Sequence, residues 1–302
     1  MKHVAVLMGG WSAEREVSLV SGRACAAALA EAGYRVTTVD VDRELPRVLD
    51  RLRPDVVFNA LHGRMGEDGR VQGLLDLLGI PYTHSGVRAS ALAMHKPTAR
   101  TLFRAAGLPV AEGRVCTAEE LRRAPPLTPP FVVKPEDEGS SVGVVIVRDE
   151  ADLVRLAAED WPATRRLLVE RYVPGRELTC AVLDDEPLAV TEIVAADGFY
   201  DYAAKYVPGR SRHLLPAPLP ASVTRRVLEI AREAHRVLGC RGVSRADLRW
   251  DPDRGEEGLV LLEVNTQPGM TPTSLLPEQA AHRGLSFRDL VVRLVEMARC
   301  DP

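Results

Sequence analysis

Two polar side chains end an otherwise apolar segment near the C-terminal end of this 302-residue sequence. The segment GLVLLEVN (258–265) is typical of a β-strand, and it places Glu263 and Asn265 after a run of leucine and valine. Because side chains alternate between the two faces of a strand, we expect Glu263 and Asn265 to share the face of Leu261. A strand face of this kind packs in a hydrophobic core at its beginning and contributes to a polar site at its end.

A second strand-like segment, GVSRADLRW (242–250), contributes another carboxylate, since Arg245 and Asp247 share one of its faces. The carboxylates of Asp247 and Glu263 and the amide oxygen of Asn265 are hard oxygen ligands. Such ligands suit Mg²⁺, which is commonly completed by substrate phosphates and water. The alternative is that these residues are polar ends of edge strands that face solvent.

Lysines and a loop rich in glycine and serine could contact phosphate. Lys134 ends the apolar run FVVK, and Lys96 lies near the start of a predicted helix. A lysine binds phosphate as a point charge. The loop EGSSVGV (138–144) follows Lys134; its glycines allow close approach of backbone N–H groups, and Ser140 and Ser141 add hydroxyls. An ordinary β-hairpin turn without a ligand explains this stretch equally well.

Two common nucleotide motifs are missing from the sequence. The loop after Lys134 lacks the GK[ST] ending of a Walker loop. The first strand–loop segment, MGGWSAE (8–14), lacks the GxGxxG pattern of a dinucleotide-binding fold, so NAD is not indicated.

Composition narrows the class of protein. Hydrophobic residues make up 46% of the chain and charged residues 27%, as in ordinary globular proteins. The net charge of −3 gives no reason to expect nucleic acid or an anionic membrane as a partner. No apolar run approaches the roughly 20 residues that span a bilayer. The five cysteines are scattered and form no CxxC pair, which fits a reducing cytoplasm better than a disulfide framework or a zinc site.

The first ninety or so residues alternate between strand and helix patterns. Strand patterns occur at 3–8, 34–41 and 54–61, and helix patterns at 15–33 and 69–79. This alternation predicts an α/β fold with parallel strands and crossover helices. Binding loops lie at the carboxyl ends of such strands, which places residues 9–14 and 61–69 on one rim.

The rest of the chain predicts two further regions, which agrees with a length that exceeds a single core. Strand patterns occur at 131–135, 142–147, 166–173, 177–183 and 188–195. Helix patterns occur at about 149–159, 222–238 and 286–298, and a long polar loop occupies 196–217.

Several of these segments together resemble the D-alanine–D-alanine ligase family, ATP-grasp enzymes of peptidoglycan synthesis. The matching blocks are long, occur in the family's order and cover nearly the whole chain. They are GGWSAEREVSL (9–19), ALHGRMGEDGRVQGLL (60–75), PYTHSGVRASALAMHK (81–96), VVKPEDEGSSVGV (132–144), FYDYAAKY (199–206), SRADLRW (244–250) and LLEVNTQPGMTPTSLLP (261–277).

The resemblance implies an α/β N-terminal domain with a parallel sheet (1–93), followed by a two-lobed ATP-grasp fold of α+β type. The central lobe (94–174) would carry the glycine–serine loop, and the C-terminal lobe (175–302) the metal ligands and a lid loop. The implied activity is ATP-dependent ligation of two D-alanines through an acyl phosphate, in the cytoplasm, with no nucleic acid or membrane as partner. Two Mg²⁺ ions per site, replaceable by Mn²⁺, and a homodimer are also implied. The alternative is another ATP-grasp carboxylate–amine ligase, or one that makes D-alanine–D-lactate.

The resemblance also implies roles in binding ATP and metal. Phosphate contacts are implied for Lys96, Lys134, Ser141 and Lys205. Adenine and ribose contacts are implied for Glu170, Arg171, Tyr172, Val173 and Glu177. Asp247, Glu263 and Asn265 match the metal ligands, with Glu263 shared between two ions and Asn265 also close to ATP.

The substrate roles come from the same resemblance. Glu14 would bind the ammonium of the first D-alanine, and His62 would lie near its carboxylate. Ser274 and Leu275 would bind the carboxylate of the second D-alanine. Arg245 and the Gly269 N–H would stabilise the oxyanion, and Ser140 and Tyr206 would form with Glu14 a hydrogen-bonded set that closes the lid loop.

Three positions depart from the usual family pattern. Trp11 stands where a small polar residue is common, His95 where aspartate is frequent, and Gln267 where serine is frequent. None of these three departures affects a residue to which the resemblance assigns a role. Tyr206, in the lid loop, favours the dipeptide product over D-alanine–D-lactate.

Overall fold

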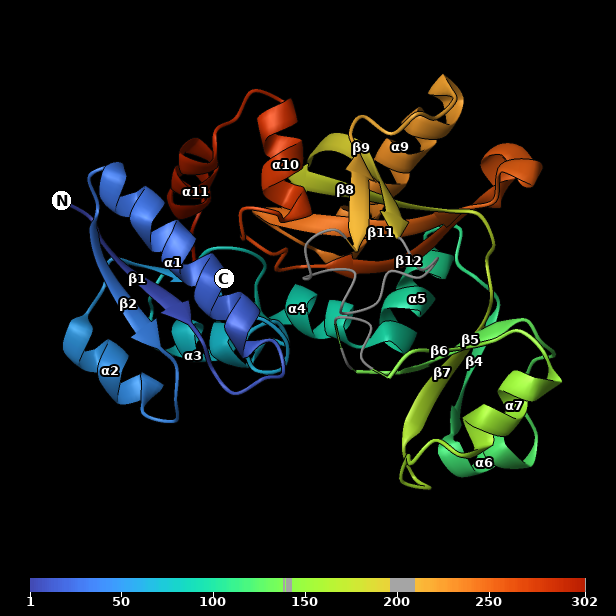
Figure 1. Ribbon diagram of the computed structural model, residues 1–302. Helices are drawn as coiled ribbons and strands as arrows, with labels where there is room; N and C mark the ends of the chain where they lie inside the picture. The colour runs from blue at the N-terminus through green and yellow to red at the C-terminus, as the bar shows by residue number, and fades with distance from the viewer. Residues whose placement is uncertain (138, 140–142, 196–209, 302) are drawn as a thin grey trace.

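Three β-sheets organise the computed structural model, which describes residues 1–137, 139, 143–195 and 210–301 (Figure 1). The first sheet is parallel and the other two are antiparallel. Their strands are β1 (His3–Met8), β2 (Arg35–Asp40) and β3 (Val56–Asn59); β4 (Gly113–Thr117), β5 (Phe131–Pro135), β6 (Val145–Val147) and β7 (Arg166–Arg171); and β8 (Arg176–Leu183), β9 (Glu186–Ala195), β10 (Ser211–Leu214), β11 (Val243–Trp250) and β12 (Leu259–Asn265).

Helices cover the faces of these sheets. They are α1 (Arg15–Glu31), α2 (Leu45–Leu52), α3 (Arg70–Leu77), α4 (Val87–Met94), α5 (Lys96–Ala105), α6 (Ala118–Arg123), α7 (Glu150–Ala157), α9 (Ala221–Leu238), α10 (Leu275–His282) and α11 (Phe287–Glu296), with a 3₁₀ helix η1 (Pro252–Gly258). No helix in the described part of the chain has the length and apolar character needed to cross a membrane.

The N-terminal sheet has the order β2-β1-β3, and all of its strands are parallel. One core packs its apolar side chains against α1 and α11, and another packs the opposite face against α2 and α3. Figure 1 shows α11, from the C-terminal end of the chain, beside α1. The predicted parallel α/β sheet is confirmed, and the loops after β1 and β3 lie on one rim.

The two antiparallel sheets have the orders β4-β7-β5-β6 and β10-β9-β8-β11-β12. Helices α6 and α7 pack on the four-stranded sheet, whereas α5 and α9 share a core with β8, β11 and β12. The predicted α+β organisation of the later chain is therefore confirmed. The boundaries at 93/94 and 174/175 stay predictions.

Strand β12 contains a β-bulge near its centre. In the register with β11, Asp247 lies opposite Glu263, but the next residue, Leu248, lies opposite Leu261. Leu262 is therefore an extra residue with no counterpart on β11. An extra residue reverses the alternation of side chains beyond it.

The bulge corrects one prediction made from the sequence. Leu261 and Val264 both lie in the core formed with α5 and α9. Glu263 and Asn265 consequently lie on the opposite face, where they line a cavity. The prediction that they share the face of Leu261 is wrong, because strict alternation has no place for an extra residue.

We expect the buried His235 on α9 to make folding sensitive to acid. Its Nδ1 lies 2.7 Å from Ser244 Oγ, and burial lowers the pKa of His235 from 6.5 to about 4. The unfolded chain therefore takes up this proton at a higher pH than the folded chain. The free energy of unfolding should fall as the pH decreases from 6.5 towards 4, by up to ~1.4 kcal/mol per pH unit.

Urea denaturation at a series of pH values measures this dependence. The His235→Gln variant should lose less stability over the same pH range than the unaltered protein. Equal slopes for the two proteins would show that other groups cause the acid sensitivity.

Candidate active site

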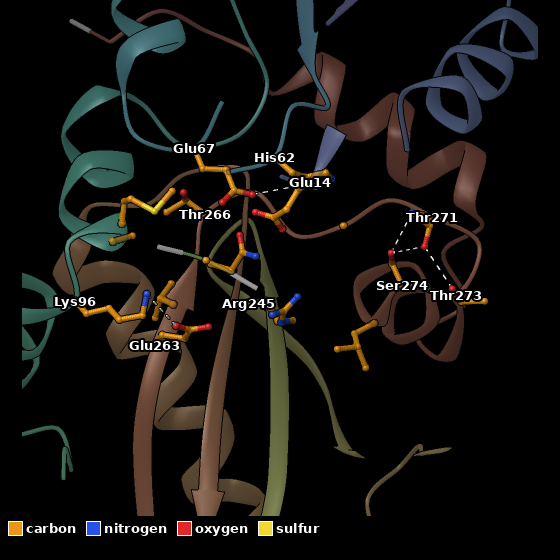
Figure 2. A pocket seen from close by; sticks show the side chains of 17 residues that line it. Glu14, His62, Glu67, Lys96, Arg245, Glu263, Thr266, Thr271, Thr273 and Ser274 are labelled. Carbon is orange, nitrogen blue, oxygen red and sulfur yellow. Dashed lines mark hydrogen bonds and ion pairs between the residues drawn. The ribbon is translucent and has the colours of Figure 1, made fainter. Parts of the chain in front are cut away.

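A cavity opens where the loops after β1 and β3 meet α4, the start of α5 and the ends of β11 and β12 (Figure 2). Side chains from distant parts of the chain surround it. The predicted site residues that line it are Glu14, His62, Lys96, Arg245, Glu263, Asn265, Gly269, Ser274 and Leu275. The fold therefore brings most of the residues predicted around the substrates into one place.

Two loops of the N-terminal sheet form one wall of the cavity. Ser12 Oγ donates a hydrogen bond to the backbone oxygen of His62 (2.7 Å) and accepts one from the backbone N–H of Glu14 (3.2 Å). These bonds connect the loop after β1 to the loop after β3. Glu14 and His62 are both buried, and Figure 2 shows their side chains close together at the cavity wall.

Glu67 also lines the cavity and was not among the predicted residues. Its Oε1 lies 3.1 Å from His62 Nδ1, while His62 Nε2 lies 3.3 Å from Ser21 Oγ. Burial lowers the pKa of His62, but the hydrogen bond to Glu67 and the charges of Glu67 and Glu14 outweigh it and raise the pKa overall. Burial raises the pKa of the Glu67 carboxyl. The only sequence feature that could have pointed to Glu67 is that it is an acidic residue in the same loop as His62.

The carboxylate of Asp247 is held by its neighbours on the sheet. Arg245 donates two hydrogen bonds to it, from Nε at 2.8 Å and from Nη2 at 2.6 Å. Thr179 on β8 donates a third, at 2.7 Å. Arg245 and Asp247 are 13% and 14% exposed and lie on β11, an inner strand, so the edge-strand interpretation does not apply to Asp247. Glu263 does lie on an edge strand, β12, and is 33% exposed.

Glu263 and Asn265 lie opposite Asp247 and Arg245 across the two strands. Lys96 Nζ lies 3.8 Å from Glu263 Oε2 (Figure 2). Asn265 Oδ1 accepts a hydrogen bond from the backbone N–H of Gln267 at 2.7 Å, which orients the amide. The structure thus brings the predicted metal ligands together.

The donor chemistry of this group fits a hard divalent cation. Asp247 and Glu263 supply carboxylates, and Asn265 supplies an amide oxygen, as Mg²⁺ prefers. In the described part of the chain, no three His, Cys, Asp or Glu side chains gather as a metal-binding group. A cation at this point would therefore depend on two carboxylates and one amide, with the remaining ligands from phosphate and water.

The loop after β12 leads into α10, a helix that the sequence patterns did not predict. Ser274 is the residue before α10, and its Oγ accepts a hydrogen bond from the Thr271 N–H (3.0 Å) and lies 2.7 Å from Thr271 Oγ1. A Cβ on Gly269 would lie 2.8 Å from Ser274 Oγ, so a larger residue would displace that hydroxyl. Backbone N–H groups at a helix start attract anions.

A second group of predicted residues lies on β5 and β7 of the four-stranded sheet. Lys134 on β5 forms an ion pair with the buried Glu170 on β7, and Arg100 Nε lies 2.9 Å from Glu170 Oε1. Arg171 directs its exposed side chain to Glu112, at 3.5 Å. The sequence did not predict that Arg100 belongs to this group, because a single arginine on a helix has no distinctive pattern.

The remaining nucleotide positions follow β7. Tyr172 and Val173 lie on the segment that leads to β8, and Glu177 lies on β8 with Oε2 3.5 Å from Arg249 Nη1. Ser140, Ser141, Lys205 and Tyr206 lie outside the described residues.

The three departures from the family pattern have different environments. Trp11 is 53% exposed. His95 precedes α5, and its Nδ1 accepts a hydrogen bond from the Thr98 N–H at 3.3 Å. Gln267 is buried, and its Nε2 donates to the backbone oxygens of Asn59 (2.8 Å) and Leu61 (2.7 Å).

Comparisons with known proteins agree with this arrangement. A family described as D-ala D-ala ligase C-terminus matches residues 102–296, and one described as D-ala D-ala ligase N-terminus matches residues 47–85. The D-alanine–D-alanine ligase of Cereibacter sphaeroides is 62% identical over 298 residues, covering 99% of this chain and 96% of the relative. That of Parvibaculum lavamentivorans is 58% identical over 303 residues, covering 99% and 98%.

Solved structures show the same similarity. The D-alanine–D-alanine ligase of Bacillus anthracis complexed with ATP superposes with a TM-score of 0.81 at 31% identity, covering 98% of this chain and 96% of that one. The ligase of Coxiella burnetii gives a TM-score of 0.81 at 28% identity, covering 98% and 93%. The fold class predicted from the resemblance, a parallel-sheet domain before an ATP-grasp fold, is confirmed.

Replacing Glu67 should change the proton affinity of His62. In Glu67→Gln, His62 loses a charge and a hydrogen bond that raise its pKa, whereas its burial remains, so the pKa of His62 should fall. An NMR titration of the His62 ring protons measures the shift. The exposed Glu16 provides a matched control, since Glu16→Gln should leave the titration of His62 unchanged. An unchanged pKa in Glu67→Gln would rule out the electrostatic coupling.

Proposed function

The chain belongs to the D-alanine–D-alanine ligase family and is a ligase that uses ATP to join D-alanine, and on this premise we propose that the cavity in Figure 2 is its active site. One observation supports this assignment above all. Glu14 and His62 from the N-terminal loops face Arg245, Glu263 and Asn265 from β11 and β12 around a single cavity. The alternative of a different carboxylate–amine ligase is not favoured, because the relatives at 58% to 62% identity are named D-alanine–D-alanine ligases.

The first half of the proposed reaction activates a carboxylate. A carboxylate is a poor acyl donor, and ATP converts it into an acyl phosphate with a good leaving group. Phosphoryl transfer mainly requires positioning and neutralisation of charge. Lys96 and Lys134 would contribute positive charge, while Asp247, Glu263 and Asn265 would hold Mg²⁺. When bound, the metal neutralises charge on the phosphates.

The substrate ends would be bound by groups of opposite charge. Glu14 suits the ammonium of the first D-alanine. The raised pKa of His62 favours its cationic form, which suits a carboxylate. Ser274 and the first N–H groups of α10, from Leu275 onward, suit the carboxylate of the second D-alanine.

The second half of the proposed reaction forms the peptide bond. The neutral amine of the second D-alanine attacks the carbonyl carbon of the acyl phosphate, and negative charge develops on the carbonyl oxygen. The bond from that carbon to the phosphate oxygen then breaks, and phosphate leaves as the peptide bond forms. Arg245, which the two hydrogen bonds to Asp247 hold in place, and the N–H of Gly269 would stabilise that charge. Losing one such donor typically costs about 2.7–4 kcal/mol of transition-state stabilisation.

The roles of four further residues, the location of the enzyme, its metal and its oligomeric state also belong to this proposal. The roles of Ser140, Ser141, Lys205 and Tyr206 rest on their positions in family motifs, since these residues lie outside the described part of the chain. All five cysteines are free, in keeping with a cytoplasmic location. The choice of Mg²⁺ or Mn²⁺ and the homodimer are inferred from the family alone.

Release of phosphate from ATP tests the substrate directly. We expect release with D-alanine and almost none with L-alanine, because Glu14, His62 and the reacting carboxylate would bind only one handedness productively. A coupled phosphate assay with each amino acid alone measures the difference. The proposed substrate is incorrect if D-alanine gives no more phosphate than L-alanine.

The metal assignment predicts the behaviour of a second variant. Glu263→Gln should fold normally but lose most of its turnover, because a shared metal ligand loses its charge. Circular dichroism and the phosphate assay measure the two properties. Glu257, exposed just before β12, offers a matched control, and Glu257→Gln should keep full activity. Near-normal turnover of Glu263→Gln would show that Glu263 is not a metal ligand.

A further inference from the structure

The segment of residues 172–175 connects β7 of the four-stranded sheet to β8 of the five-stranded sheet (Figure 1). The residues proposed to contact adenine and ribose lie on this segment and beside it. Its conformation therefore decides where a nucleotide can bind. The backbone N–H of Tyr172 donates to the Pro130 oxygen at 3.2 Å, which secures the β7 end of the segment.

One side chain from β11 secures the rest of the segment. Arg249 donates from Nε to the Val173 oxygen (3.2 Å) and from Nη2 to the Gly175 oxygen (2.9 Å). Its guanidinium carbon lies 5.7 Å from the centre of the Tyr172 ring. Its Nη1 lies 3.5 Å from Glu177 Oε2, and the Arg249 side chain is only 13% exposed. A single guanidinium thus contacts backbone, ring and carboxylate along the whole segment.

The segment also approaches β11 too closely for an ordinary residue. Gly175 has a φ of +92°, and a Cβ there would lie 2.1 Å from the Trp250 oxygen. Glycine permits both the backbone conformation and the contact. The segment is consequently held against the end of β11 that carries Arg249.

The position of Arg249 on β11 links this segment to the chemistry of the cavity. Arg245, Asp247 and Arg249 alternate with Ala246 and Leu248, which lie in the core. The three polar side chains therefore share one face of the strand. Along the strand, each of these residues lies about 7 Å from the next one. A single strand sets the distance between the metal ligands and the segment that would contact the nucleotide.

We propose that Arg249 is a positioning residue for ATP, which holds the Tyr172–Gly175 backbone and the Glu177 carboxylate in the orientation that receives adenine and ribose. This inference rests on the proposed function, because it takes the nucleotide contacts of Tyr172, Val173 and Glu177 from it. Lysine cannot replace these contacts fully, because its point charge lacks the planar fork of arginine.

Arg176 provides a matched control for Arg249. It lies on β8 directly opposite Trp250 and, like Arg249, contacts an aromatic ring and a carboxylate. Its Nε donates to Glu192 at 2.7 Å and its Nη2 to the Pro218 oxygen at 3.1 Å, away from the 172–175 segment. Replacing Arg176 should therefore lower the folding stability of the protein but leave its affinity for ATP unchanged.

Titration calorimetry of ATP in the presence of Mg²⁺ and without D-alanine tests the inference. In Arg249→Met the Kd for ATP should rise about tenfold or more, and in Arg249→Lys it should rise less. Arg176→Met should bind ATP within about twofold of the unaltered protein, while thermal unfolding reports the stability of each variant. In Arg249→Met/Glu177→Gln the loss should be smaller than the product of the two single losses, because Arg249 acts partly through Glu177.

Three results would overturn the inference: unchanged ATP binding in Arg249→Met, an equal loss in Arg176→Met, or a double variant whose loss equals the product of the single losses. If Arg249→Met fails to fold, Arg249→Lys is judged by the same criteria. Because binding is measured without D-alanine, the result does not depend on the ligase assay. Absence of phosphate release with D-alanine would overturn the proposed substrate and leave this result standing.

Discussion

The antiparallel pairing of β11 with β12 is the constraint on which the site depends. It places Asp247 directly opposite Glu263, and residues opposite each other in such a pair have Cβ atoms about 4.5–5.5 Å apart. Carboxylates on two such neighbouring side chains repel one another unless cations neutralise them. Arg245, bonded to Asp247, and Lys96, close to Glu263, supply this neutralisation in the structure.

The bulge at Leu262 makes the pairing compatible with a hydrophobic core. Without the extra residue, Glu263 would lie on the same face as Leu261 and would enter the core with α5 and α9. With it, Val264 fills the core and Glu263 reaches the cavity. The burial of a carboxylate without a partner is costly, so the bulge and the site depend on each other.

The buried side-chain amides of Asn59 and Gln267 connect the N-terminal wall of the cavity to Asn265, one of the proposed metal ligands. Gln267 Oε1 accepts from Asn59 Nδ2 at 3.0 Å, and Gln267 Nε2 donates to the oxygens of Asn59 and Leu61. Leu61 directly precedes His62, and the Gln267 backbone orients Asn265. Because unpaired buried polar groups are unfavourable, this network resists displacement of one wall of the cavity relative to the other.

The sequence by itself determined the parallel N-terminal sheet, most strands and long helices, and the delivery of Lys134, Asp247 and Glu263 by strands. These features follow from local periodicity, and the family motifs added roles for single residues. Only the tertiary structure decided the bulge at Leu262, because cross-strand register depends on two segments at once. It also decided the partners of Gln267 and Arg249, since the Asn59–Gln267 contact joins residues 208 positions apart and no local pattern reports such a distance.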